Sequence, residues 1–222
     1  MPRKILATVF QSLDGVMQAP GGPSEDPTDG FDLGGWQMGF PDEEAGQAIG
    51  DSLKPPYALL LGRKTYDIFA AYWPFHHGED DRIAHDFNAA EKLVMTHSGA
   101  PLEWANSRPL SGFDDLAAVR NEAGPDLQIW GSASLYPELI ERGMLDRLTV
   151  LTYPLVLGKG KRTFREGTPP ATLKLRSGRI TGKVVAIATF TPSPGVALAQ
   201  SPPAQANQSE DRRQRRIAEG TW

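Results

Sequence analysis

Residues 57–65 read YALLLGRKT, an apolar run that ends at a glycine, two basic residues and a threonine. An apolar run with little alternation is typical of a strand covered on both faces, and Gly62 breaks it. Apolar residues then recur at helical spacing until Trp73, and Pro74 closes the segment. We therefore predict a buried strand over residues 57–61 that leads into a helix over residues 65–73.

Strands and helices alternate on both sides of this unit. We predict strands over residues 5–10, 91–96 and 127–130 and helices over residues 45–53, 114–123 and 134–142. A Gly-, Pro- and Asp-rich loop over residues 19–35 follows the first strand, and loops of this length in compact domains are often functional. The alternation predicts an α/β fold with a mostly parallel central sheet.

The pattern changes after Asp146. Residues 147–157, 173–176 and 183–191 are predicted strands with no helix between them, so the sheet ends in antiparallel C-terminal strands. We assign residues 1–192 to one domain. Residues 193–222 are polar and Arg-rich, and we predict a disordered tail, because the segment lacks the apolar residues needed for a core. Its four arginines could contact RNA or an acidic partner, or stay solvated.

The composition favours a small-molecule partner. The 222 residues include 23 basic and 27 acidic ones, and a net charge of −4 argues against nucleic acid or anionic lipid as the partner. Cysteine is absent, which excludes thiol catalysis and cysteine-ligated metals. No pair among His76, His77, His85 and His97 has the i, i+4 spacing of a metalloprotease helix, so we predict no metal site. No signal peptide or membrane span is evident, and we expect a cytoplasmic protein.

The junction at Gly62, Arg63, Lys64 and Thr65 is the first candidate binding site. The free N–H groups of a helix N-terminus, two cations and a hydroxyl group suit an anion such as a dinucleotide phosphate. The alternative is a plain turn with a solvated helix start.

A second strand-to-helix junction contains Gly131, Ser132, Ala133, Ser134 and Leu135. Its small residues allow the backbone to approach a ligand closely, or they serve only to pack helix against sheet. Two such junctions at the carboxyl ends of strands are typical of ligand sites in open α/β sheets. Neither junction matches the Rossmann or P-loop motif.

Ordered motifs along the chain carry a family resemblance. They read SLDG at residues 12–15, GW at 35–36, LGRKTY at 61–66, GSASL at 131–135 and PLVLGKGKRTF at 154–164. In this order they resemble the dihydrofolate-reductase-like superfamily, and within it the C-terminal domain family of bacterial bifunctional deaminase-reductases. The resemblance implies a three-layer α/β/α fold. The deaminase zinc signature is absent, so a stand-alone reductase domain is expected, and Arg147 replaces an acid that is frequent in the family.

The resemblance also implies NADPH as cofactor. Arg63 and Thr65 would hold the adenosine phosphates, and residues 131–135 would lie along the pyrophosphate and the nicotinamide half. The family places a further phosphate or ribose contact at Thr96, and Ala7 and Gly15 would border the nicotinamide. Arg63 and Lys64 would favour NADPH over NADH, because charge-assisted phosphate contacts contribute roughly 1.5–3 kcal/mol each.

Candidates for the substrate side are few. Asp14, in the turn beside the expected nicotinamide, is a candidate catalytic acid or a turn residue that caps its own backbone. Glu43 is a candidate substrate-binding acid or compensates the charge of a helix N-terminus. Trp36 and Phe40 could wall the substrate pocket or fill the core under the loop.

The expected function is hydride transfer from NADPH to a small pterin- or pyrimidine-like heterocycle. The alternatives are a true dihydrofolate or riboflavin-pathway reductase, and a protein that binds NADPH without turnover. Family analogy suggests a homodimer.

Overall fold

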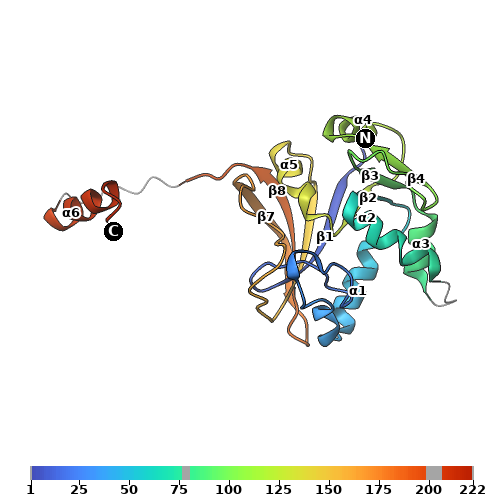
Figure 1. Ribbon diagram of the computed structural model, residues 1–222, viewed down its shortest axis with the longest axis horizontal. Helices are drawn as coiled ribbons and strands as arrows, with labels where there is room; N and C mark the ends of the chain where they lie inside the picture. Colours follow the sequence, from blue (N-terminus) through green and yellow to red (C-terminus); the bar gives the residue numbers. More distant parts are fainter. Residues whose placement is uncertain (1, 77–80, 199–206, 222) are drawn as a thin grey trace.

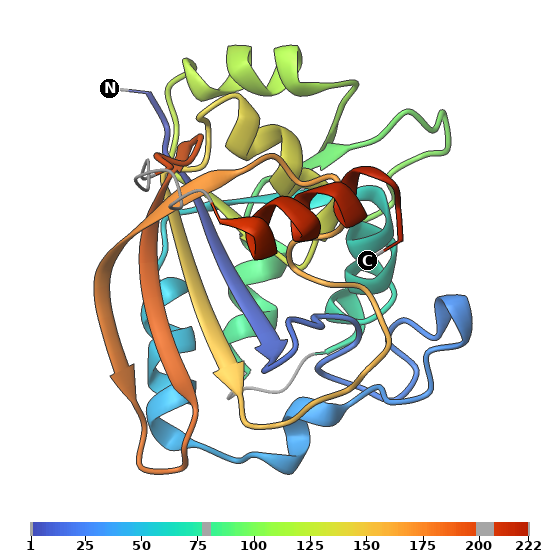
Figure 2. The same ribbon diagram turned by 90° about the vertical axis from the view of Figure 1, so that its left-hand side faces the viewer.

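The computed structural model describes residues 2–76, 81–198 and 207–221. Within these ranges eight strands form one sheet in the order β4-β3-β2-β5-β1-β6-β8-β7 (Figures 1 and 2). The strands are β1 (Ile5–Ser12), β2 (Ala58–Gly62), β3 (Lys92–Met95), β4 (Ser107–Leu110), β5 (Leu127–Trp130), β6 (Arg147–Tyr153), β7 (Ala171–Ile180) and β8 (Ala186–Pro194).

The six strands from β4 to β6 are parallel, whereas β8 pairs antiparallel with both β6 and β7. Figure 2 shows β7, β8, β6 and β1 side by side in this order. The mostly parallel sheet with antiparallel C-terminal strands confirms the predicted fold class. The helices are α1 (Glu43–Ser52), α2 (Arg63–Ala70), α3 (Arg82–Ala89), α4 (Phe113–Arg120), α5 (Tyr136–Glu141) and α6 (Gln208–Ala218).

Alternate residues of β2 serve two different cores. Leu60 packs with residues of α4 and α5 on one face of the sheet. Leu59 and Leu61 pack with residues of α2 and α3 on the other face, where α1 also contributes Leu53 at its end. Because side chains alternate along a strand, a strand buried on both faces requires an uninterrupted apolar run. The three-layer arrangement follows.

One strand and one helix between residues 1 and 192 were absent from the sequence prediction. Strand β4 is polar, contains Pro109 and pairs with β3 at the edge of the sheet, where the missing N–H of proline is tolerated. Helix α3 begins after Asp81, whose carboxylate accepts a hydrogen bond from the Ala84 N–H at 3.0 Å. An aspartate ahead of a short apolar pattern is a signal for a helix start, so the sequence did carry an indication of α3.

The observed ends of two C-terminal strands differ from the predicted ones. Strand β6 ends at Tyr153, because Pro154 follows, and not at residue 157. Strand β7 runs from Ala171 to Ile180, well beyond the predicted residues 173–176, with a register shift between Leu175 and Ser177.

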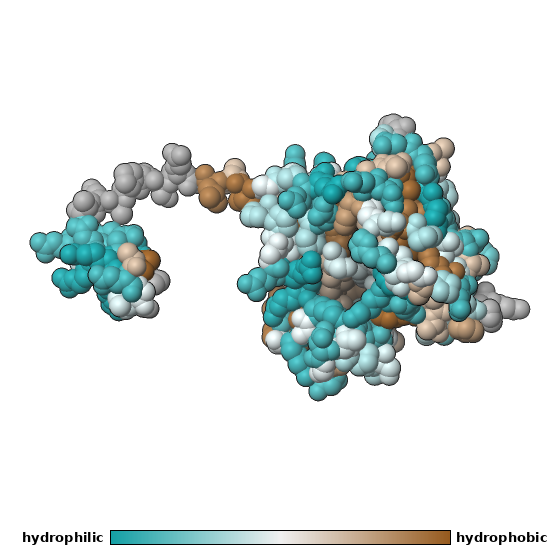
Figure 3. Space-filling view, turned by 45° about the horizontal axis from the view of Figure 1, so that its top comes forward, coloured by the Kyte–Doolittle hydropathy of each residue, from teal (hydrophilic) through white to brown (hydrophobic). Residues whose placement is uncertain are grey.

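The C-terminal segment contributes no described residue to the cores. Helix α6 lies within the segment predicted to be disordered, has no buried residue and presents a mainly hydrophilic surface (Figure 3). Residues 199–206 and Trp222 lie outside the described ranges, so the tail as a separate unit stays a prediction. Among the described helices none has the length and apolar character needed to cross a membrane.

Candidate functional site

A cleft of about 440 Å³ opens where β1, β2 and β5 reach their carboxyl ends. This is the edge at which open α/β sheets bind ligands. Aromatic side chains, backbone turns and charged groups together form the walls: Phe10, Met17, Gln18, Ala19, Pro20, Glu25, Asp26, Gly62, Arg63, Lys64, Thr65, Ile68, Phe69, Trp130, Gly131, Ser132, Ala133, Ser134, Lys161, Arg162 and Arg165.

The two predicted junctions meet in this cleft and bond to each other. The Gly62 N–H donates to Ser132 Oγ at 2.9 Å, and the Ser132 N–H donates to Thr65 Oγ1 at 3.1 Å. Gly131 has φ +67°, and a Cβ there would lie 3.1 Å from the Thr65 methyl carbon, so a larger residue would be strained. The local sequence pattern predicted both junctions but not the hydrogen bonds that link them.

The N-terminus of α2 has no side-chain cap and no acid in its first turn. Its first N–H groups therefore lack the acceptor that a capping side chain supplies. Arg63 lies beside them, and its guanidinium group bonds to Asp67 at 2.8 Å and to the Ala100 carbonyl at 3.0 Å. This combination of backbone N–H groups and a guanidinium group fixed by hydrogen bonds favours binding of an anionic group.

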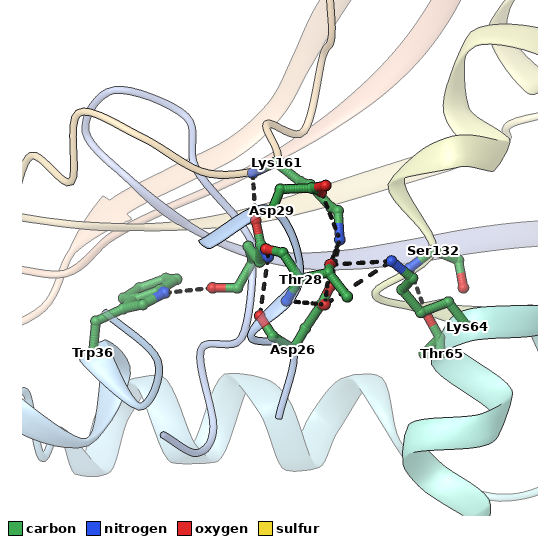
Figure 4. A network of polar contacts seen from close by, with 9 residues as sticks. Asp26, Thr28, Asp29, Trp36, Lys64, Thr65, Ser132 and Lys161 are labelled. Carbon is green, nitrogen blue, oxygen red and sulfur yellow. Dashed lines mark hydrogen bonds and ion pairs between the residues drawn. The ribbon is translucent and has the colours of Figure 1, made fainter. Parts of the chain in front are cut away.

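A polar network links the loop after β1 to α2 and to the loop before β7 (Figure 4). Lys161 Nζ lies 2.7 Å from Asp26 and 2.5 Å from Thr28 Oγ1, and Lys64 Nζ reaches the same hydroxyl group at 3.2 Å. Burial acts to raise the pKa of Asp26, but the hydrogen bonds from Lys161 and Thr28 outweigh it and lower the pKa. The contact with Lys161, together with burial, lowers the pKa of Lys64.

Cations outnumber acids on the cleft walls. Five basic side chains line it, Arg63, Lys64, Lys161, Arg162 and Arg165, against the two acids Glu25 and Asp26. Most of these bases are ion-paired: Arg63 with Asp67, Lys161 with Asp26 and Arg162 with Asp14, whereas Arg165 has no ion pair among the described residues. Arginine and lysine side chains with N–H donors left over at a cleft wall favour a ligand that carries phosphate or carboxylate groups.

Of the twelve predicted cofactor residues, eight line the cleft and four do not. Ala7 and Leu135 are buried in the core next to α4 and α5. Gly15 occupies a turn with φ +81°. Thr96 follows β3, and its hydroxyl group accepts a hydrogen bond from the Ser98 N–H at 3.0 Å. The roles proposed for these four residues stay predictions.

Asp14 lies outside the cleft lining and joins two loops. Its carboxylate accepts hydrogen bonds from the Ser12 hydroxyl group at 2.6 Å and from the N–H groups of Leu157 and Gly158 at 3.1 and 2.9 Å. These contacts, the Ser12 bond first, lower the pKa of Asp14 to about 2. An acid ionised down to this pH has no proton to donate near neutrality, so the contacts favour a structural role.

The three predicted substrate residues also lie outside the lining. Trp36 is 8% exposed, donates its indole N–H to the Gln18 carbonyl at 2.8 Å and packs against Tyr153. Phe40 packs against the same tyrosine ring at 5.9 Å, and Glu43 is exposed in the first turn of α1. For Trp36 and Phe40 the geometry favours the core-filling alternative.

Several residues that line the cleft had no role predicted from the sequence. Glu25 and Asp26 belong to the loop that we predicted to be functional, but its composition did not single them out. Lys161 and Arg162 occur in a motif that supported only the family resemblance. Their signal was the local density of basic residues between 159 and 165.

The described residues contain no group of three or more potential metal ligands. His77, one of the four histidines considered, lies outside these residues. The prediction of no metal site therefore stays a prediction.

Comparison with known proteins gives a family and a fold. The model of the RibD C-terminal domain matches residues 3–187. The uncharacterised protein YyaP of Bacillus subtilis is 23% identical over 186 residues, which cover 80% of this chain and 88% of YyaP.

Two solved structures are similar in fold. A protein of Shewanella sp. PV-4, assigned provisionally to riboflavin biosynthesis, has a TM-score of 0.62 at 15% identity, with 87% of this chain and 99% of that chain covered. Dihydrofolate reductase of Enterococcus faecalis, in complex with NADP(H) and a ligand named RAB-propyl, has a TM-score of 0.52 at 15% identity, with 85% and 96% covered.

Proposed function

This chain belongs to the RibD C-terminal domain family, and we propose that it is a reductase that transfers a hydride from NADPH to a small pterin- or pyrimidine-like heterocycle. The observation that carries the proposal is the pair of strand-to-helix junctions joined through Ser132 and Thr65 at one cleft. The similar fold of an enzyme complexed with NADP(H) supports it.

The residues present fit such a cofactor. The uncapped N-terminus of α2 and the side chains of Arg63 and Lys64 would bind phosphate groups, and Gly131 permits a close backbone approach. Phe10, Phe69 and Trp130 supply apolar surface for an aromatic ring. When bound, NADPH would supply the hydride, while the chain's own residues would position the acceptor and exclude water.

The test of the cofactor is a titration with NADPH and NADH, followed by quenching of tryptophan fluorescence. Trp130 lies in the cleft, so a bound nicotinamide would quench it. We expect NADPH to bind more tightly, and Arg63→Ala to weaken it about tenfold or more, equal to at least roughly 1.4 kcal/mol.

The matched control is Arg82→Ala. Arg82 is paired to Asp86 four residues on, as Arg63 is to Asp67, but on α3 and outside the cleft. Binding of neither nucleotide, or equal losses in the two variants, would contradict the proposed site.

Turnover is tested separately with a panel of pterins and pyrimidines, by following the oxidation of NADPH. Saturable binding without any consumption would mean a cofactor-binding protein instead of a reductase.

We also propose a homodimer. Strand β7 forms an edge of the sheet over ten residues, with Leu175 and Ile180 59% and 74% exposed, and long exposed strand edges are commonly covered in proteins. Light scattering of the purified protein should give twice the chain mass of 24.2 kDa. A monomer mass would contradict this proposal without affecting the cofactor site.

A further inference from the structure

Glu25 places a carboxyl group on the wall of the cleft. Its Oε2 accepts hydrogen bonds from the backbone N–H groups of Gly21 and Gly22, at 2.7 and 3.2 Å. Its Oε1 has no hydrogen-bond partner among the described residues. One oxygen is therefore held by the loop, while the carboxyl group belongs to a residue that lines the cleft.

The neighbouring acid is engaged differently. Asp26 bonds to Lys161 and Thr28, whereas Glu25 forms no ion pair with any residue that the structure describes. Burial raises the pKa of Glu25, with a further rise from the charge of Asp26, and the two glycine N–H groups oppose it in part. Of the two acids in the cleft, Glu25 is the one whose pKa is raised, whereas the pKa of Asp26 is lowered.

The other ionisable groups that face the cleft are bases: Arg63, Lys64, Lys161, Arg162 and Arg165. Arginine stays protonated in proteins, so it binds anions but does not donate a proton. Both lysines are hydrogen-bonded to the Thr28 hydroxyl group. No histidine or tyrosine lines the cleft within the described residues.

We propose that Glu25 is the proton donor of the cleft, an inference that rests on the proposed reductase function. Hydride addition to the carbon of a polarised C=N or C=O bond leaves negative charge on the nitrogen or oxygen, which needs a proton. The O–H bond of the Glu25 carboxyl group breaks, and an N–H or O–H bond forms on the acceptor. Two electrons pass from the reduced nicotinamide to the acceptor, and the Glu25 carboxylate regains its proton from water.

Two substitutions distinguish the role of Glu25 as a proton donor from its role in holding the loop. Glu25→Gln keeps a side-chain oxygen for the Gly21 and Gly22 N–H groups but carries no acidic proton. Glu25→Asp keeps the acid with a shorter side chain. The matched control is Glu103→Gln, which removes an exposed acid outside the cleft.

The first readout is ¹³C NMR of the protein labelled at the glutamate side-chain carboxyl carbons. We expect one resonance to titrate above the ordinary glutamate value of 4.5 and to be missing in Glu25→Gln but present in Glu103→Gln. Bound NADP⁺ should move its midpoint, because the nucleotide displaces water and brings charge near the carboxyl group. An ordinary or lowered pKa, or a midpoint that bound NADP⁺ leaves unchanged, would overturn the assignment.

The second readout is turnover with whichever pterin or pyrimidine the wild-type protein reduces. In Glu25→Gln we expect kcat to fall about 100-fold or more while the dissociation constant for NADPH stays within about threefold. Wild-type kcat/KM should fall as pH rises through the pKa of Glu25, and Glu25→Asp should recover part of the activity. Activity of Glu25→Gln within threefold of wild type would overturn the proposal.

The failure of the two proposals can be told apart. If the wild-type protein binds neither NADPH nor NADP⁺, or binds them and reduces no member of the panel, the reductase function fails and the proton donor with it. If turnover occurs and Glu25→Gln retains it, only the role of Glu25 fails.

Discussion

Ser132 and Thr65 are hydrogen-bonded in the wall of the cleft: the Ser132 backbone N–H donates to Thr65 Oγ1 at 3.1 Å. Ser132 Oγ in turn accepts a hydrogen bond from the Gly62 N–H at 2.9 Å. The two residues are 67 positions apart in the chain. Their hydrogen bonds fix the relative position of the turns after β2 and β5, on which the proposed cofactor site depends.

Replacing the serine hydroxyl group tests this link. Ser132→Ala leaves the buried Gly62 N–H without its partner, so we expect the free energy of unfolding to fall by about 1–3 kcal/mol. Urea denaturation measures it. Ser98→Ala is the control, because the Ser98 hydroxyl group accepts an exposed N–H and its loss should cost little. Equal effects of the two substitutions would show that the link does not contribute.

Asp14 should contribute stability that depends on acid pH. Its pKa is about 2 in the folded chain against 3.8 ordinarily, so its contribution is complete above 3.8 and is lost as pH falls from 3.8 to 2. At pH 7 we expect Asp14→Asn to destabilise by about 1–2 kcal/mol, since two loops lose a charged acceptor.

Unfolding measured from pH 7 to pH 2 checks this expectation. The curves of wild type and Asp14→Asn should converge at the acid end, whereas substitution of the exposed Glu103 by Gln should leave the wild-type curve unchanged. A constant gap over the whole range would refute the role of the charge.

Lys92 should make the stability of the fold depend on pH in the alkaline range. It is fully buried, its ammonium group donates to the carbonyls of Asn88 and Ala105 at 2.8 and 3.0 Å, and burial lowers its pKa to about 8 from 10.5. Between these values the unfolded chain binds more protons than the folded one, so stability should rise with pH, by at most about 3 kcal/mol.

Lys92→Met removes this titration. Its free energy of unfolding, compared with that of wild type from pH 7.5 to 10.5, should lack the rise, while Lys174→Met at an exposed position of β7 should keep it. Parallel curves for wild type and Lys92→Met would contradict the assignment.

Trp36 should matter for folding more than for cofactor binding. Trp36→Phe keeps a ring against Tyr153 but removes the donor to the Gln18 carbonyl, and we expect a loss of about 1–2 kcal/mol. The dissociation constant for NADPH should stay within about twofold of wild type. Trp73→Phe is the control, since the Trp73 indole N–H has no hydrogen-bond partner among the described residues. A large loss of NADPH affinity in Trp36→Phe would favour a wall of the pocket instead.

Local patterns were enough to predict most of the fold. The apolar runs at residues 5–10 and 57–61 and the breaks at Gly62 and Gly131 placed the strands and the turns that end them, because alternation and glycine act within a few residues. Strand β4 was missed because an edge strand buries little and carries no periodicity. Eight predicted cofactor residues line the cleft, and six of them are small residues at those turns: two glycines, two serines, one threonine and one alanine. The same local pattern predicted them.

Other parts of the site depend on contacts between distant residues. The sequence by itself determined an α/β sheet with antiparallel C-terminal strands and two glycine-containing turns at strand ends, because these features follow from side-chain size and spacing along the chain. Only the tertiary structure decided that Asp14 is bound to Leu157 and Gly158, that Lys161 neutralises Asp26, and that Glu25 lines the cleft with no ion pair among the described residues. The burial and charge environment of an acid is set by residues far away in the chain, so spacing alone cannot distinguish an acid that can hold a proton from one that is ion-paired.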